Sequence, residues 1–201
     1  MARALPHVRD AVPDDAPALL SLWTDLLGAA GPGAHSWALP TVEGVRTRLE
    51  AVADDPDRRV LVASVVASVD GPEHEQVGGF ALLLREPLTP LHDELAVRVS
   101  HLHVLAAQRR HGVGHALVAT ATDWAAESGA DHVVVDVPPA AREANRFYAR
   151  LGFAALLVQR SAPVATLVRR RLAEPPVAAE DVLVQRVTQR ARARARVRAL
   201  R

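Results

Sequence analysis

The segment with the most chemical content is a short loop that holds two glycines. Residues 109–114 read Arg-Arg-His-Gly-Val-Gly, directly after a β-branched apolar stretch and directly before a helical pattern. Gly112 and Gly114 lack a Cβ, so their backbone N–H groups can turn toward an anion, and a helix N-terminus adds partial positive charge. The loop therefore predicts a cradle for a phosphate or pyrophosphate. The alternative is an ordinary glycine turn between a strand and a helix.

Two better-known phosphate loops do not match this segment. A Walker A loop ends in Gly-Lys-Ser/Thr, and the chain contains no lysine. A dinucleotide fingerprint needs a third glycine three residues after Gly114, where this chain has Leu117. Nucleotide hydrolysis by a Walker A loop and nicotinamide binding by that fingerprint are therefore excluded.

Three side chains near this loop or after it could move protons. His101 and His103 alternate along the preceding stretch and would share one face of a regular strand. An imidazole, with an ordinary pKa of about 6.5, suits general acid–base catalysis near neutral pH. Tyr148 is the only tyrosine, and a phenol can protonate a leaving group. Each of the three could instead simply pack on a sheet, and Asp93, Glu94 or a chain of waters are alternative bases.

The hydropathy pattern places these residues among alternating strands and helices. We expect helices after a cap at Asp14 or Asp15, over 41–53, over 113–127 and over 140–151, the last ending at Gly152. We expect strands over 7–12, 60–69, 76–86, 94–106, 132–137, 153–160 and 164–172, with 60–69 and 76–86 forming a hairpin. This order predicts a mixed α/β fold.

Composition limits the protein's class. With 201 residues, 49% of them apolar, the chain can form one domain with a real core. It has no apolar run long enough to span a membrane and no apolar N-terminal stretch of the kind a signal peptide needs, so we expect a cytoplasmic protein. The absence of cysteine excludes disulfides and thiolate nucleophiles. His111 and His115 have the spacing of a zinc pair, but no third ligand is near in sequence, and we expect no metal.

Charge is distributed unevenly along the chain. Residues 1–181 hold 17 arginines and all 23 acids, a net charge of −6, whereas the last 20 residues hold seven arginines and no acid. This tail could bind nucleic acid, acidic lipid or an acidic partner. We favour a solvated helix or a tail that lies on the acidic body. The predicted organisation is a domain over 1–172 and an arginine-rich helix or tail over 173–201.

Three motifs together resemble the GNAT superfamily of acyl-CoA-dependent N-acetyltransferases, over roughly residues 8–172. The first is Leu-x-Val-x-x-x-x-Arg-x-x-Gly-x-Gly over 102–114, the second is Phe-Tyr-x-x-x-Gly-Phe over 147–153, and the third is the start of the chain over 8–15. The resemblance implies a mostly antiparallel mixed sheet with flanking helices, splayed at a β-bulge between its fourth and fifth strands.

The same resemblance implies a co-substrate site. Acetyl-CoA would pair its pantetheine arm with the backbone of Leu102, His103 and Val104. Its pyrophosphate would lie in the loop formed by Arg109, Arg110, His111, Gly112, Val113, Gly114 and His115. Tyr148 occupies the family's general-acid position. Two departures are Ala106, where a proline is usual, and Ala141, where many relatives have an asparagine that Asn145 could replace.

The histidine pair is similar to one in serotonin N-acetyltransferases, but lies three residues nearer the loop. The ungapped equivalents here are Arg98 and Ser100, and an odd offset reverses the face of a regular strand. A bulge between His101 and Val104 could restore the face.

The expected activity is transfer of an acetyl group from acetyl-CoA to a primary amine, by direct attack in a ternary complex. The acceptor would be a small molecule, and an acidic, aromatic wall would suit a cationic amine; the residues of this wall are Trp23, Asp25, His35, Trp37 and Glu43. We expect neither a membrane nor a nucleic acid as partner, and because related enzymes are commonly dimers, a homodimer is an open alternative. The alternative function is a non-catalytic acyl-CoA-binding domain whose arginine-rich tail binds nucleic acid or a partner.

Overall fold

The structure is a computed structural model in which residues 6–29, 38–67, 74–91, 93–156 and 164–173 are described. The chain divides into two compact units, residues 1–145 and 146–201. Each unit is described by itself below. Within the described residues, none of the helices combines the length and the apolar character needed to cross a membrane.

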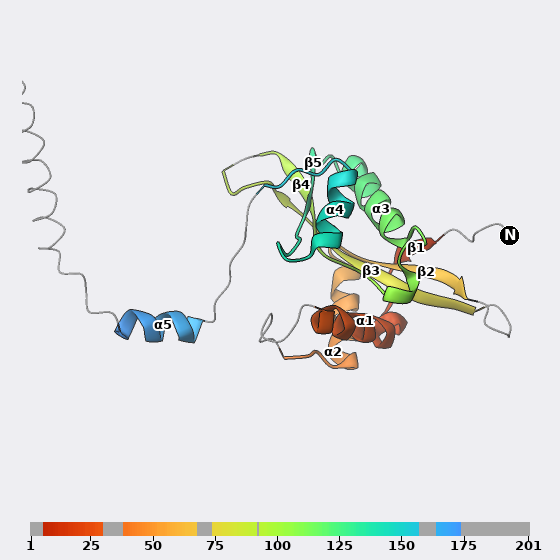
Figure 1. The fold of residues 1–201 in the computed structure, drawn as a ribbon, viewed down its shortest axis with the longest axis horizontal. Coiled ribbons are helices and arrows are strands. Elements are labelled where there is room, and N and C mark those ends of the chain that lie inside the picture. Colours follow the sequence, from red (N-terminus) through yellow and green to blue (C-terminus); the bar gives the residue numbers. More distant parts are fainter. Residues whose placement is uncertain (1–5, 30–37, 68–73, 92, 157–163, 174–201) are drawn as a thin grey trace, which may run out of the picture. The chain divides into compact units, whose positions relative to one another are not determined.

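The first unit is built on a five-stranded sheet whose strands follow one another in chain order. Every neighbouring pair is antiparallel except the last, which is parallel. This confirms the predicted mixed α/β fold and the predicted hairpin (Figure 1). The strands are β1 (His7–Asp10), β2 (Arg58–Ala67), β3 (His74–Pro87), β4 (Leu95–Val104) and β5 (His132–Val135).

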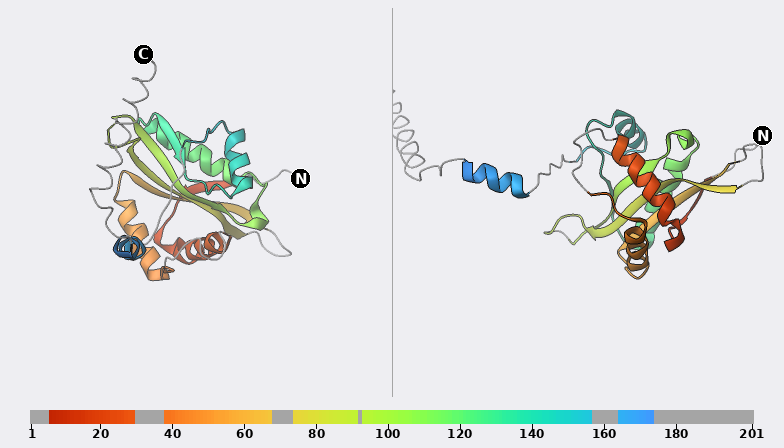
Figure 2. Two further views of the ribbon diagram at one scale, coloured as in Figure 1. Left: turned by 60° about the vertical axis from the view of Figure 1, so that its left-hand side comes forward. Right: turned by 90° about the horizontal axis from the view of Figure 1, so that it is seen from below.

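The helices of this unit lie where their periodicity predicts them. The α-helices are α1 (Ala16–Ala29), α2 (Val42–Ala53) and α3 (Val113–Glu127), and short 3-10 turns precede α1 and α3 over Pro13–Asp15 and Ala106–Gln108. Helices α1 and α2 cover one face of the sheet and α3 covers the other (Figure 2). Consecutive residues of the central strands alternate between the two faces, so that Leu61 packs toward α3 and Val62 toward α1.

A buried carboxylate fixes the start of α1. Asp15 is 8% exposed, accepts two hydrogen bonds from Arg9 at 2.6 and 2.8 Å, and accepts a third from the Val12 N–H at 2.8 Å. The hydrogen bonds from Arg9 lower the pKa of Asp15, against the opposing effect of burial. Val12, and neither Asp14 nor Asp15, is the N-cap of the 3-10 turn that precedes α1, so the predicted cap is wrong; Asp15 is the third residue of that turn and bonds back to the N–H of the N-cap.

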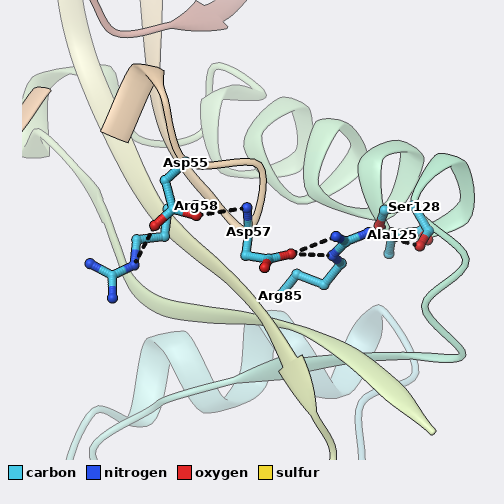
Figure 3. Close-up of polar contacts among 6 residues, drawn as sticks. All are labelled: Asp55, Asp57, Arg58, Arg85, Ala125 and Ser128. Atoms are coloured by element: carbon cyan, nitrogen blue, oxygen red, sulfur yellow. Dashed lines mark hydrogen bonds and ion pairs between the residues drawn. The ribbon is translucent and has the colours of Figure 1, made fainter. Parts of the chain in front are cut away.

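The C-terminal end of α3 is tied to the sheet by arginine. Arg85 on β3 bonds Asp57 at 2.6 Å and donates to the Ser128 carbonyl oxygen at 3.2 Å, just past the end of α3 (Figure 3). Asp57 itself is held by a turn in which its N–H donates to Asp55 at 3.0 Å. This network, together with the core packing of α3, fixes where that helix lies on the sheet.

A glycine in β3 lets the beginning of α3 approach the sheet closely. A Cβ at Gly79 would lie 2.8 Å from the His103 carbonyl oxygen and 2.9 Å from Val113 Cγ1. Such contacts are too short for real side chains, so only glycine fits there without a shift of the backbone. The first residue of α3, Val113, thereby lies close to β3 and to the backbone of β4.

The second unit departs from the sequence prediction. Helix α4 (Arg142–Arg150) begins in the first unit and ends in the second, close to the predicted 140–151. The strand predicted over 164–172 is wrong, because α5 (Val164–Ala173) is a helix. Residues 153–156 are not a strand either, and the remainder of the predicted 153–160 lies outside the described residues.

The error over 164–172 has a physical cause. β-branched residues such as Val164, Thr166 and Val168 favour a strand, but strand preference depends strongly on having a partner strand. Val164, Leu167 and Val168 also share one face of a helix. The segment that follows, including the arginine-rich tail, lies outside the described residues, so the predicted division at residue 172 stays a prediction.

Candidate functional site

Strands β4 and β5 separate halfway along β4. Their parallel pairing covers only Ala96–Val99 against His132–Val135, and the last bond runs from the Asp136 N–H to the Val99 carbonyl oxygen at 3.1 Å. Beyond this point β4 continues to Val104 with no strand of the described chain on that side. The expected splay between the fourth and fifth strands is therefore present.

A β-bulge lies at the same point. Leu83 on β3 pairs with Val99, whereas the neighbouring Leu82 pairs with His101, so that Ser100 is an extra residue. The sequence analysis placed a bulge between His101 and Val104, and the structure places it just before that segment. An extra residue reverses the alternation of the strand. Arg98 therefore lies on the same face as His101 and His103 despite the odd spacing.

The bulge also decides which backbone groups face the open edge of β4. The Leu105 N–H donates to the Gly78 carbonyl oxygen on β3 at 2.9 Å, so alternation directs the backbone groups of His103 toward β3 as well. Those of Leu102 and Val104 point to the other edge, where β5 has left the sheet. Of the three residues expected to pair with pantetheine, two present backbone groups to the splay, and His103 presents only its side chain to the site.

The loop after β4 ends in backbone N–H groups that have no partner within α3. Gly112 caps α3 in the left-handed conformation, with φ 86°, and Arg110 is also left-handed, with φ 64°. The first bond of α3 runs from the Ala116 N–H to the Gly112 carbonyl oxygen at 2.9 Å. The N–H groups of Val113 and Gly114 precede that bond and have no partner within the helix. No side chain caps this end of α3.

Cationic and polar side chains surround the loop. Arg109, Arg110 and His111 are exposed, and His111 Nδ1 lies 2.8 Å from the Arg109 carbonyl oxygen. Arg109 donates from Nε to the Val104 carbonyl oxygen at 3.2 Å, which joins the loop to the open edge of β4. His115, in the first turn of α3, is exposed too. The loop and the open edge are therefore one continuous polar surface.

The face of β4 opposite α3 carries both histidines and an aromatic residue from α1. The His101 ring lies 4.9 Å from that of Trp23, centroid to centroid, and His101 Nδ1 is 3.3 Å from Ser100 Oγ. His103 packs 6.3 Å from the Phe80 ring. The structure therefore brings together His101, His103 and Trp23, which the sequence analysis had assigned to the base and to the acceptor wall.

The two acidic residues of the proposed acceptor wall, Asp25 and Glu43, interact with different partners. Asp25 on α1 lies with its Oδ2 2.7 Å from His103 Nε2. Glu43 on α2 is exposed and 3.8 Å from Arg46 Nε. Residues 35 and 37, which the sequence analysis added to this wall, lie outside the described residues. Asp25 is thus a partner of the candidate base.

A half-buried arginine, Arg98, lies on the α1 side of β4 next to the point where β4 and β5 separate. Arg98 bonds Glu86 on β3 at 2.5 Å and Asp136, just after β5, at 3.1 Å. The hydrogen bond with Glu86 raises the pKa of Arg98 above its ordinary range, against the effect of burial. This arginine links three adjacent strands immediately before the splay.

Two further predicted site residues lie on α4. The side-chain NH₂ group of Asn145 donates hydrogen bonds to the carbonyl oxygens of Ala141 at 2.9 Å and Pro138 at 3.1 Å. These bonds link Asn145 to the segment just before α4. Tyr148 is 7% exposed and makes edge contacts with Phe147 and Phe153. Burial raises the pKa of Tyr148 to about 12, which keeps the phenol protonated at neutral pH.

Three features that shape this site were not predicted from the sequence. The pairing of Asp25 with His103 joins residues 78 positions apart, and no local pattern signals it. The position of the bulge at Ser100 depends on the register with β3. The Gly78–Gly79 doublet inside a strand was a visible signal of close backbone approach.

No metal centre is evident in the described part of the chain, where no three histidine, aspartate or glutamate side chains are close enough to share an ion. His111 and His115 lie on the loop and on the first turn of α3.

Comparisons with solved structures give the same fold. A transcriptional regulator from Bacillus halodurans superposes with a TM-score of 0.62 at 21% identity, covering 79% of this chain and 99% of its own. Glucosamine-6-phosphate N-acetyltransferase from Arabidopsis thaliana gives 0.61 at 17% identity, covering 79% and 97%. An aminoglycoside N-acetyltransferase in complex with CoA gives 0.58 at 14% identity, covering 80% and 97%.

Sequence comparison identifies the family. No curated protein matches the chain. The family model described as acetyltransferase (GNAT) family matches residues 33–153, which include the splayed strand, the glycine loop and the Phe-Tyr motif. The chain therefore belongs to the GNAT family of acetyltransferases.

Proposed function

We propose that this protein is an acetyl-CoA-dependent N-acetyltransferase that acetylates a primary amine by direct attack in a ternary complex. The observation that carries the proposal is the continuity of the open edge of β4 with the glycine loop. Leu102 and Val104 offer backbone groups at the splay, and the N–H groups of Val113 and Gly114 follow a few residues later. An extended amide-bearing arm that ends in a pyrophosphate fits such a surface.

The chain's own residues would divide the work as follows. Backbone groups of Leu102 and Val104 would hold the pantetheine arm, and the loop over 109–115 would hold the pyrophosphate, with Arg109 and Arg110 adding charge. The thioester supplies an activated acetyl group. A histidine on the α1 side of β4 would take the proton from the attacking amine. Tyr148 would donate its proton to the thiolate that leaves when the C–S bond breaks.

The acceptor is proposed to be a small-molecule amine in the cytoplasm, without a membrane or nucleic-acid partner and without a metal. The aromatic ring of Trp23 beside His101 favours an acceptor with an apolar portion. Asp25 is already bonded to His103, so its charge is shared with the imidazole. A homodimer stays an open alternative.

Binding and turnover are separate tests of this proposal. Calorimetric titration with acetyl-CoA measures binding, and thiol release over a panel of primary amines measures transfer. We expect binding, and thiol release that depends on an amine. Binding without amine-dependent release would contradict catalysis and favour a non-catalytic acyl-CoA-binding domain. Salt-sensitive nucleic-acid binding that disappears on deletion of 182–201 would favour the alternative in which the tail is the functional element.

Substitution of the acid tests the proposed roles. Tyr148→Phe should lower kcat by roughly 100-fold, since general acid catalysis contributes about 10²–10⁴-fold, with little change in the Kd for CoA. Phe147→Leu, at the adjacent ring, is the matched control for local packing. An unchanged kcat in Tyr148→Phe would remove Tyr148 from the acid role.

A further inference from the structure

His103 and Asp25 form a short hydrogen bond between the sheet and α1. His103 Nε2 lies 2.7 Å from Asp25 Oδ2. The histidine side chain is 6% exposed, whereas that of Asp25 is 52% exposed. The pair therefore consists of a buried ring and a carboxylate that reaches solvent.

This bond fixes which ring nitrogen carries the proton. Ordinary aspartate side chains are ionised at neutral pH and can only accept hydrogen bonds. Nε2 must then be the protonated nitrogen, and in a neutral ring the lone pair lies on Nδ1. Ser64 Oγ is the one buried side-chain nitrogen or oxygen without a partner among the described residues. His103 Nδ1, which has no hydrogen bond to a described residue, is therefore not sealed in the core.

We propose that Asp25 is a positioning residue that holds His103 as the Nε2–H tautomer, so that Nδ1 is the atom that accepts the proton of the attacking amine. This inference rests on the proposed acetyltransferase function and selects His103 from the two histidines. When Nδ1 takes the proton, the ring becomes an imidazolium, and the adjacent carboxylate stabilises that charge. The proton removed from nitrogen thus stays on the ring until solvent takes it.

The competing explanation is a purely structural tether between α1 and β4. The variant Asp25→Asn separates the two explanations. An asparagine amide can donate to Nε2, which keeps a hydrogen bond at this place but moves the ring proton to Nδ1. A tether would survive this change, whereas a base that needs its lone pair on Nδ1 would not.

The direct readout is the tautomer of His103 in the full-length protein. Two-bond ¹H–¹⁵N correlation spectra of histidine-labelled protein at pH 8.5, about two units above the ordinary histidine pKa, distinguish the tautomers. His103→Gln identifies the signals among those of the nine histidines. We expect the Nε2–H pattern in the unaltered protein and the Nδ1–H pattern in Asp25→Asn. An Nδ1–H pattern in the unaltered protein would overturn the proposal.

Kinetics supply the second readout. We expect Asp25→Asn to lower kcat at least tenfold with an unchanged Kd for CoA, and Asp25→Glu to recover part of the loss. Asp14→Asn, which alters a carboxylate whose side chain is 91% exposed on the same N-terminal segment, should leave kcat unchanged. Full activity in Asp25→Asn would overturn the positioning role.

The two proposals can fail separately. If the unaltered protein releases no thiol with any amine, the proposed function fails, and the spectra still decide whether Asp25 sets the tautomer. If the protein is active but Asp25→Asn leaves both tautomer and kcat unchanged, only the positioning role fails. If Asp25→Asn does not fold, the test rests on the tautomer of His103 in the unaltered protein and on the kcat of Asp25→Glu. An Nδ1–H pattern in the unaltered protein would then contradict the positioning role.

Discussion

The two halves of β4 differ although they belong to one strand. Leu95–Val99 has a strand on both sides, and its Arg98 is ion-paired to Glu86 and Asp136. Among the described strands, Ser100–Val104 pairs with β3 alone, and it carries the two histidines and the edge that leads to the glycine loop. The bulge at Ser100 divides the halves. The first half is suited to holding the sheet together, and the second half presents the strand edge at which we propose that the co-substrate binds.

One inserted residue can therefore change which face of a strand a side chain occupies. Without the extra residue at the bulge, the histidines would face α3 and the core that it covers. With it, they face α1, and the backbone of Leu102 and Val104 faces the splay. Substitutions in the first half should therefore change stability, and substitutions in the second half or its loop should change CoA binding or turnover.

The largest effect is expected at the loop. Gly112→Asp introduces a side chain at φ 86° and a negative charge beside the proposed pyrophosphate site. We expect the Kd for CoA to rise roughly 100-fold, about 2.7 kcal/mol, measured by calorimetry. Gly129→Asp is the matched control, because Gly129 has a φ of 71° and follows the opposite end of α3. Equal affinity in the two variants would show that the loop is only a turn.

The next largest effect is expected at Gly79 on β3, which lies against the second half of β4. Gly79→Ala would put a Cβ against the His103 carbonyl oxygen and Val113. We expect a loss of about 2 kcal/mol in the free energy of unfolding, measured in urea. Gly28→Ala, on α1 where a Cβ meets nothing within 4 Å, should cost nothing. Equal stability of the two variants would refute the close approach of α3 to the sheet.

The proposed acid, Tyr148, can be examined without any substrate. Because Tyr148 is the only tyrosine and burial raises its pKa to about 12, absorbance at 295 nm should show little tyrosinate at pH 11. The raised pKa stabilises the fold fully below about pH 10, and this contribution is lost as the pH rises toward 12. Relative to Tyr148→Phe, the unaltered protein should lose about 1 kcal/mol between pH 9 and 11. A titration midpoint near 10 would contradict the burial of the phenol.

The smallest effect is expected in the first half of β4. Arg98→Gln breaks two partly buried ion pairs, and we expect a loss of about 1 kcal/mol of stability with an unchanged Kd for CoA. Arg46→Gln, whose partner Asp14 is almost fully exposed, should change stability by less than about 0.5 kcal/mol. A marked loss of CoA affinity in Arg98→Gln would contradict the claim that the first half of β4 does not bind the co-substrate.

Local patterns in the sequence were enough to predict most of the fold. The helix over 113–127 and the hairpin of β2 and β3 follow from apolar periodicity, and Gly112 and Gly114 signal the loop through their chemistry. The site required more than local information. The place of the bulge depends on pairing with β3, and the contact of Asp25 with His103 depends on how α1 packs across the sheet. The strand predicted over 164–172 was wrong because strand preference alone does not supply a partner strand.

The central claim is that the second half of β4 and its loop bind the co-substrate while the first half does not. Amide chemical-shift changes on addition of CoA to ¹⁵N-labelled full-length protein test it directly. We expect the largest changes at Leu102, Val104 and the loop over 109–115, and small changes over Leu95–Val99. Saturating CoA that leaves the loop amides unshifted, or that shifts both halves of the strand alike, would contradict the claim.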